Sequence, residues 1–199
     1  MLRRARLLLW VLVAVAAVLA ALLFLRAERQ APDLAAAAQP VDFGGPFTLT
    51  ASDGTRFSSE RLAGKPYAIF FGFTHCPDVC PTTLARMARL RGQLGKGDDA
   101  FRIVFVSVDP ERDSPAEMAR YAALFDTPIV ALTGTPAEIE AVKKLYGIFS
   151  EKVPQPGGGY SVDHSAAVLL IDRDRKFLGT IAPDEGDPAA LAKLGRLTA

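Results

Sequence analysis

Short apolar runs alternate along the chain with longer stretches in which hydrophobic residues recur at helical spacing. Three runs of strand length have few polar interruptions, at residues 67–73, 101–108 and 166–172. Such runs are typical of strands that are buried on both faces of a sheet. Helical spacing is found at residues 81–94, 115–125, 136–146 and 188–197. This alternation of strands and helices predicts an α/β domain.

Shorter patterns complete the predicted sheet. The shorter predicted strands are residues 47–50, 56–57, 128–132 and 176–182. Residues 147–153 and 160–162 flank a tip rich in proline and glycine, which is typical of a hairpin. The order of elements predicts a central mixed sheet flanked by helices, with parallel crossovers first, an antiparallel pair at the end and an extra hairpin.

The chain begins with an apolar run that follows Arg3, Arg4 and Arg6. Residues 7–25 carry no charge, and nineteen residues of helix span about 28 Å, close to the hydrocarbon thickness of a bilayer. The run is long for a cleaved signal peptide, which is the alternative interpretation. We therefore expect residues 1–26 to be a transmembrane helix that anchors the chain.

Charges on the two sides of this run favour a cytoplasmic N-terminus. Three arginines precede it, whereas Arg26 and Arg29 follow it and are offset by Glu28. We expect a single-pass protein of the bacterial inner (cytoplasmic) membrane, with its domain facing the periplasm or the cell exterior. Residues 27–46 lack a sustained core pattern and are expected to be a flexible linker, which leaves residues 47–199 as the folded domain.

Composition excludes two classes of protein. Lys and Arg number 23 against 22 Asp and Glu, and no basic stripe with interleaved aromatic residues occurs, so nucleic-acid binding has no support. The two cysteines are too few for a disulfide scaffold. Two cysteines separated by three residues instead form a local site, because they can act together without joining distant parts of the chain.

That pair, Cys76 and Cys80, follows the first predicted central strand, where open α/β sheets place ligands. Pro81 suits the first position of a helix, which would put Cys80 at or next to the N-cap. The helix N-terminus stabilises thiolate, so we expect at least one thiol to be more acidic than a free cysteine. With helical spacing the two Cα atoms lie about 6 Å apart, which permits either a disulfide or a shared soft metal ion.

Copper(I) fits such a site because it is soft, accepts low coordination and favours thiolate with imidazole. Three side chains are candidates for a third ligand. His164 is either a turn histidine bonded to backbone or a ligand delivered by the hairpin. Strand alternation points His75 away from Cys76, and Asp78 has the character of a turn or capping residue.

Four segments resemble the SCO/SenC family, the copper-binding thioredoxin-like proteins of cytochrome c oxidase assembly. They are Phe-Gly-Phe-Thr-His-Cys-Pro-Asp-Val-Cys-Pro at 71–81, Phe-Val-Ser-Val-Asp-Pro-Glu-Arg-Asp-Ser-Pro at 105–115, Leu-Thr-Gly at 132–134 and Val-Asp-His-Ser at 162–165. They occur in the family's order, and the resemblance covers about residues 47–181. An N-terminal anchor is also typical of the family.

The resemblance implies a thioredoxin-like fold and a copper site. Cys76 and Cys80 match the family's metal-binding cysteines, and His164 matches the third ligand. Asp163 would orient the imidazole or its loop. Segment 105–115 carries no ligand in this picture, and within it we expect Arg112 to pair with Asp113 and Ser114 to cap a helix.

The implied function is that of a membrane-tethered copper metallochaperone rather than an enzyme. It would deliver copper to the dinuclear copper site of cytochrome c oxidase subunit II. Its expected partners are that copper domain and a thiol reductant or copper donor protein.

The main alternative is a thiol-disulfide oxidoreductase acting on the cysteines of the oxidase copper site or of other extracytoplasmic proteins. The three-residue spacing argues against it, as does the lack of a proline at residues 162–165, where such enzymes carry a cis-proline. A peroxidase-like or redox-sensing domain ranks below both. A copper site requires the His164 ring nitrogen to lie within about 4–5 Å of both sulfurs, against metal–ligand lengths near 2.0–2.3 Å.

Overall fold

The computed structural model describes residues 6, 10, 19 and 44–199. Almost all of the predicted anchor (1–26) and of the predicted linker (27–46) falls outside the described residues. Within the described part of the chain, no helix is long and apolar enough to cross a membrane. Residues 44–199 belong to one compact unit.

A seven-stranded mixed sheet forms the centre of this unit. From one edge to the other, its strands are β2 (Arg56–Ser58), β1 (Thr48–Ala51), β5 (Ile129–Thr133), β4 (Arg102–Ser107), β3 (Tyr67–Gly72), β8 (Val168–Ile171) and β9 (Phe177–Ile181). The three central strands β3, β4 and β5 run parallel, and every other neighbouring pair is antiparallel. The predicted mixed sheet, with crossovers first and an antiparallel pair last, is confirmed.

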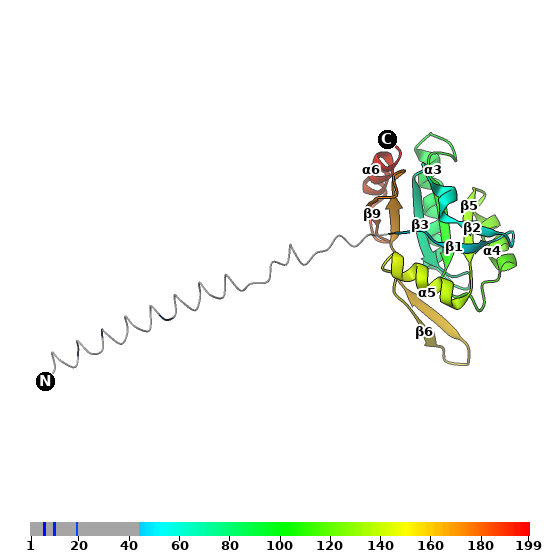
Figure 1. Ribbon diagram of the computed structural model, residues 1–199, viewed down its shortest axis with the longest axis horizontal. Coiled ribbons are helices and arrows are strands. Elements are labelled where there is room, and N and C mark those ends of the chain that lie inside the picture. The colour runs from blue at the N-terminus through cyan, green and yellow to red at the C-terminus, as the bar shows by residue number, and fades with distance from the viewer. Residues whose placement is uncertain (1–5, 7–9, 11–18, 20–43) are drawn as a thin grey trace. The chain divides into compact units, whose positions relative to one another are not determined.

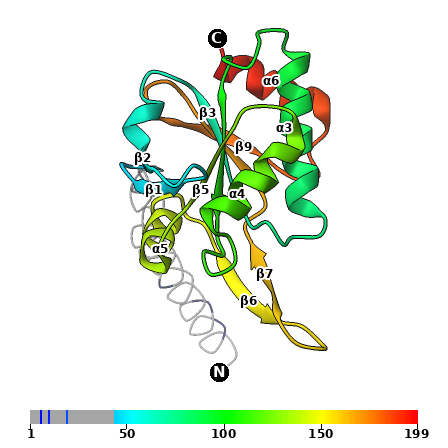
Figure 2. The same ribbon diagram turned by 90° about the vertical axis from the view of Figure 1, so that its right-hand side faces the viewer.

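Helices cover both faces of the sheet (Figure 2). They are α3 (Val79–Gln93), α4 (Pro115–Ala122), α5 (Pro136–Leu145) and α6 (Asp187–Leu197), with short 3-10 turns η1 (Ser59–Leu62) and η2 (Ala123–Phe125). In Figure 2, α3, α4 and α6 lie on one side and α5 on the other. Because both faces are covered, every residue of β3 and of β8 is buried, as the uninterrupted apolar runs predict.

The helix starts follow the sequence signals at α4 and α5. Ser114 caps α4 by accepting a hydrogen bond from the Glu117 backbone, with a proline in the first turn. Thr135 and Glu138 form a complete capping box at α5. Each cap satisfies backbone N–H groups that have no acceptor within the helix.

The start of α3 differs from the prediction by two residues. The helix begins at Val79, so Pro81 is its third residue and Cys80 lies inside its first turn. Proline is accepted there because the first N–H groups of a helix have no intrahelical acceptor. The correction matters because it moves Cys80 from the helix boundary to the buried side of the helix.

The predicted hairpin is a separate two-stranded sheet. It consists of β6 (Ser150–Pro154) and β7 (Tyr160–His164), and Figure 1 shows β6 extending away from the main sheet. Three consecutive glycines with positive φ form its tip. Since β7 continues to residue 164, two residues beyond its predicted end, the hairpin carries His164 at its base, paired with Ser150.

Candidate metal centre

Three side chains from three different elements converge at one end of the parallel strands. Cys76 lies in the loop after β3, Cys80 in the first turn of α3 and His164 at the end of β7. Their ligand atoms all lie within 4.8 Å of one another, and Nε2 of His164 is 3.5 Å from Sγ of Cys80. This separation falls within the 4–5 Å that a shared ion requires before it binds.

Cys80 occupies a tight, dry position. Its side chain is fully buried, and it lies directly over Gly72, the last residue of β3. A Cβ atom added at Gly72 would come within 2.7 Å of the Cys80 sulfur. The glycine is therefore needed so that the Cys80 sulfur can approach the backbone of β3. The sequence signal for this requirement is a single glycine within an aromatic strand.

This burial reverses the expected acidity of Cys80. Burial raises the pKa of the Cys80 thiol well above its ordinary value, the neighbouring Cys76 raises it further, and a backbone hydrogen bond from Phe73 acts in the opposite direction. The expectation of a more acidic thiol is therefore wrong for Cys80, because the loss of hydration outweighs its place in the first turn of a helix. Without a nearby cation this thiol keeps its proton.

The helix N-terminus acts on the other sulfur. The backbone N–H of Cys80 points at Sγ of Cys76, with N and S 3.4 Å apart. Cys76 is only partly buried. The sulfur of Cys80 is thus buried in the core. The sulfur of Cys76 lies nearer to solvent and accepts a hydrogen bond from a backbone N–H in the first turn of α3.

The His164 imidazole is held with its second nitrogen toward the sulfurs. Nδ1 lies 2.9 Å from the carbonyl oxygen of Ser165, and since a carbonyl can only accept, Nδ1 carries the proton. Nε2 then presents its lone pair to Cys80. The ring packs edge-on against Phe70 and Phe73, at centroid distances of 6.0 and 5.8 Å.

Asp163 does not orient this ring, contrary to expectation. Its side chain is exposed, and Nδ1 donates its hydrogen bond to the carbonyl of Ser165 instead. Successive residues of a strand point to opposite faces, so the neighbour of an inward-facing histidine on β7 faces away from it.

The two other candidate ligands lie outside the cluster. His75 is exposed, with Nδ1 3.0 Å from the Thr74 hydroxyl. Asp78 occupies the N-cap position of α3, but its carboxylate accepts a hydrogen bond from the Thr82 hydroxyl and none from the helix backbone. Among the described residues, only Cys76, Cys80 and His164 form a cluster of three or more possible metal ligands.

The expected ion pair between Arg112 and Asp113 is wrong. Arg112 pairs with Asp109, three residues earlier. Asp113 instead accepts hydrogen bonds from the backbone and hydroxyl of Thr74 and from the hydroxyl of Ser107. Adjacent residues in a turn point apart, which explains why the two side chains take different partners.

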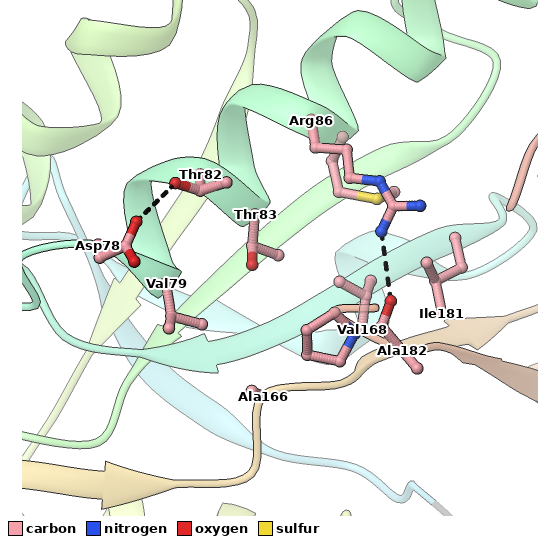
Figure 3. A pocket seen from close by; sticks show the side chains of 11 residues that line it. Asp78, Val79, Thr82, Thr83, Arg86, Ala166, Val168, Ile181 and Ala182 are labelled. Atoms are coloured by element: carbon pink, nitrogen blue, oxygen red, sulfur yellow. Dashed lines mark hydrogen bonds between the residues drawn. The ribbon is translucent and has the colours of Figure 1, made fainter. Parts of the chain in front are cut away.

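The centre opens to the surface on the side of Cys76. A shallow cavity there is lined by residues that include Phe73, Cys76, Pro77 and His164. A second cavity adjoins it and shares Asp78, Val79 and Ala166 with the first. Figure 3 shows this second cavity, where Arg86 of α3 reaches across to the Ala182 carbonyl. An incoming group can therefore reach Cys76 and His164, whereas Cys80 lies beneath them.

Comparison with known proteins identifies the family. The family model described as SCO1/SenC matches residues 35–199. The mitochondrial SCO1 homolog 1 of Arabidopsis thaliana is 37% identical over 136 residues, which is 68% of this chain and 41% of the plant protein. The chain spans 41–52% of the length of the first two curated relatives that it matches.

Solved structures agree with this match. ScoI of Bradyrhizobium japonicum, solved with copper bound, is 43% identical, with a TM-score of 0.71 over 78% of this chain and 99% of that one. BsSco, described as a member of the Sco family of cytochrome c oxidase assembly proteins in which a disulfide switch was identified, is 28% identical, with a TM-score of 0.62 over 80% of this chain and 96% of that one. The fold is thus the thioredoxin-like fold of the Sco structures, and this chain belongs to the SCO1/SenC family.

Proposed function

We propose that the chain binds one copper ion through Cys76, Cys80 and His164. The observation that carries the proposal is the convergence of two sulfurs and one imidazole nitrogen within 4.8 Å. Copper(I) accepts this soft, low-coordinate donor set, whereas a structural zinc site needs four protein ligands. Copper in the solved ScoI of Bradyrhizobium japonicum supports the choice of metal.

The electrostatics of the centre suit a monovalent ion. Two thiolates and one copper(I) leave a net charge of −1, part of which is offset by the backbone N–H of Cys80 at the Cys76 sulfur. The cation also supplies what the buried Cys80 lacks, since a bound metal ion lets a coordinating thiol ionise. The ion therefore enters as cargo and displaces protons.

The further step is delivery of the copper to the dinuclear copper site of cytochrome c oxidase subunit II. Three protein ligands leave room for an incoming sulfur, and the open side of the centre exposes Cys76 to such a group. The family description of BsSco as an assembly protein supports the same role. A thiol reductant or a copper donor protein would load the site.

Tethering to a membrane is part of this proposal. Its support is the uncharged run at residues 7–25 with arginines before it. Anchored in the bacterial inner membrane and facing the periplasm or cell exterior, the domain would work beside its membrane-bound acceptor.

A thiol-disulfide oxidoreductase is the second candidate, and one observation favours it. Cys76 and Cys80 are both free thiols and lie side by side. Two observations weigh against it: the raised pKa of Cys80 slows thiolate chemistry there, and residues 162–165 contain no proline.

Copper titration of the reduced full chain, kept in mild detergent because of its apolar N-terminal run, tests the proposal. We expect about one copper(I) ion per chain, weaker binding in His164→Ala, and no change in His75→Ala, which alters the other histidine. Transfer of the ion to a purified subunit II copper domain tests delivery. Equal affinity of His164→Ala and the natural chain would remove His164 from the site, and insulin reduction that survives His164→Ala but not Cys76→Ser would favour the oxidoreductase.

A further inference from the structure

The loop between β4 and α4 contains no candidate ligand. It contacts both the cysteine loop after β3 and the hairpin that carries His164. It follows Ser107 and ends at Ser114, the cap of α4. Its buried carboxylates, Asp109 and Asp113, are both completely shielded from solvent. Each must therefore be satisfied by protein partners, which include Thr74 of the cysteine loop for Asp113 and Tyr160 of the hairpin for Asp109.

Asp113 holds the cysteine loop. Its carboxylate accepts hydrogen bonds from the backbone N–H of Thr74 at 3.1 Å and from the Thr74 hydroxyl at 2.6 Å. The Ser107 hydroxyl adds a third at 2.6 Å. Since Thr74 lies two residues before Cys76, these bonds fix the direction in which the chain leaves β3 toward the sulfurs.

Asp109 and Arg112 hold the hairpin. The Tyr160 hydroxyl donates to Asp109 at 2.8 Å, and Nη1 of Arg112 donates to the Tyr160 carbonyl at 2.9 Å. The Arg112 guanidinium also lies over the Tyr160 ring, 3.9 Å from its centroid. Tyr160 is the first residue of β7 and His164 the last, and alternation places both on one face of that strand.

Arg112 also contacts the wall of the centre itself. Its guanidinium lies 5.7 Å from the centroid of the Phe73 ring, against which His164 packs edge-on. A planar guanidinium can hold a carboxylate, a carbonyl and a ring face together, which neither an apolar side chain nor lysine can do. Its Nη2 atom is buried without a hydrogen-bond partner in the described part of the chain, so burying the guanidinium here costs solvation free energy.

We infer that Arg112 is a positioning residue for copper binding. By clamping Tyr160 against Asp109, it holds the hairpin in the orientation that brings His164 to the sulfurs. This inference rests on the proposed copper site. Segment 105–115, which carries part of the family resemblance but no ligand, would thus support the ligand His164.

Lys152 provides a matched control. Its ammonium group lies 4.6 Å from the same Tyr160 ring, and it pairs with Glu111 of the same loop at 2.6 Å. Both of these side chains are largely exposed, so the pair contributes little. Both residues thus place a cation over the Tyr160 ring and connect the loop to the hairpin. Only Arg112 also bonds to the Tyr160 carbonyl and to the buried carboxylate of Asp109.

Copper(I) affinity of the full chain, measured by competition with a chromogenic copper(I) chelator, tests the inference. We expect Arg112→Lys to bind about 10-fold more weakly, the size typical of losing a residue that supports a metal ligand, and Lys152→Met to bind as the natural chain does. Because Arg112 acts through His164, adding Arg112→Lys to His164→Ala should cause no further loss. An equal loss in both backgrounds would overturn the inference.

A metal-free measurement separates this inference from the proposed function. Hydrogen–deuterium exchange of residues 160–164 should be faster in Arg112→Lys and unchanged in Lys152→Met. If the natural chain binds no copper, the proposed function fails. If hydrogen–deuterium exchange of residues 160–164 is unchanged in Arg112→Lys, Arg112 does not position the hairpin. If Arg112→Lys does not fold, Tyr160→Phe, which removes only the bond to Asp109, serves in both measurements with the same expected directions.

Discussion

The sulfur of Cys80 lies against the backbone of Gly72, so close that a methyl group at residue 72 would come within 2.7 Å of it. The Cys80 side chain therefore occupies the space that a side chain at residue 72 would need. The position of the deeper sulfur is fixed by the sheet below it as much as by its own helix.

Gly72→Ala should weaken copper binding. The added methyl group also meets the rings of Phe70 and Phe105 at 3.0 and 3.1 Å, so the overlap is relieved mainly by moving the sulfur of Cys80. We expect about a 10-fold loss of copper(I) affinity, measured by chelator competition, as for other changes that displace a ligand.

Gly92→Ala is the control for this change. Gly92 lies within α3, and apart from its chain neighbours and the backbone of its own helix no atom lies within 4 Å of the added Cβ. It should stabilise the chain by about 0.5–1 kcal/mol through helix propensity and leave copper affinity unchanged. Natural copper affinity in Gly72→Ala would show that the sulfur is free to move.

The stability of the metal-free chain should fall as pH rises from 7.5 to 9.5. The folded state raises the pKa of the Cys80 thiol above the unfolded value of about 8.5. Above that pH the unfolded chain has released a proton that the folded chain keeps, so the unfolded state is favoured. The contribution of this thiol is complete below about pH 7.5, and above about pH 8.5 it falls by up to about 1.4 kcal/mol per pH unit.

Urea unfolding at several pH values measures this slope. Below about pH 9 Cys80→Ala should remove most of it, whereas Cys76→Ala should retain it; above that pH, tyrosines whose pKa is raised by burial, such as Tyr121 and Tyr146, add a fall of the same sign. A slope that survives in Cys80→Ala would assign the pH dependence to another group.

The hydroxyl groups of Tyr67 and Tyr146 form a buried pair 3.0 Å apart, distant in sequence and away from the metal centre. Tyr146→Phe leaves the Tyr67 hydroxyl buried without that partner, which should cost about 1–3 kcal/mol of unfolding free energy. The double variant, with Phe at both positions, should recover part of the loss in a double-mutant cycle. Simple additivity would mean that the two hydroxyls do not depend on each other.

Thr135→Ala should destabilise the chain by about 1 kcal/mol, because it removes the capping oxygen that α5 uses. Thr135→Ser keeps that oxygen and should unfold at the same urea concentration as the natural chain. The prediction fails if the alanine variant is as stable as the serine variant.

Local patterns in the sequence predict most of this fold. Continuous apolar runs predict β3, β4 and β8, and the Ser-Pro and Thr-Pro pairs predict the starts of α4 and α5, because each signal acts through neighbours within one turn or one strand. Boundaries were less predictable. The first turn of α3 accepts Pro81 at its third position as readily as at its first, so the proline does not mark one start.

Local sequence patterns predict only part of the candidate site. The spacing of Cys76 and Cys80 indicates a shared use, but His164 lies 84 residues beyond Cys80 and was selected through family resemblance. The roles expected for Asp163 and Arg112 were wrong in detail, because the orientation of a side chain in a hairpin or turn depends on contacts that adjacent residues do not reveal. The acidity of Cys80 is likewise not predictable from its place in the helix, because burial of the side chain raises its pKa.

The separation of the hairpin from the main sheet has a consequence for how the centre opens. Within residues 44–199, β6 and β7 pair only with each other, so His164 belongs to a different hydrogen-bonded sheet from β3, the strand that leads to the two cysteines. Opening by the hairpin alone leaves the seven-stranded sheet and its core intact and requires less free energy than unfolding the domain. Displacement of the hairpin would thus remove His164 from the two sulfurs without breaking a hydrogen bond of the main sheet.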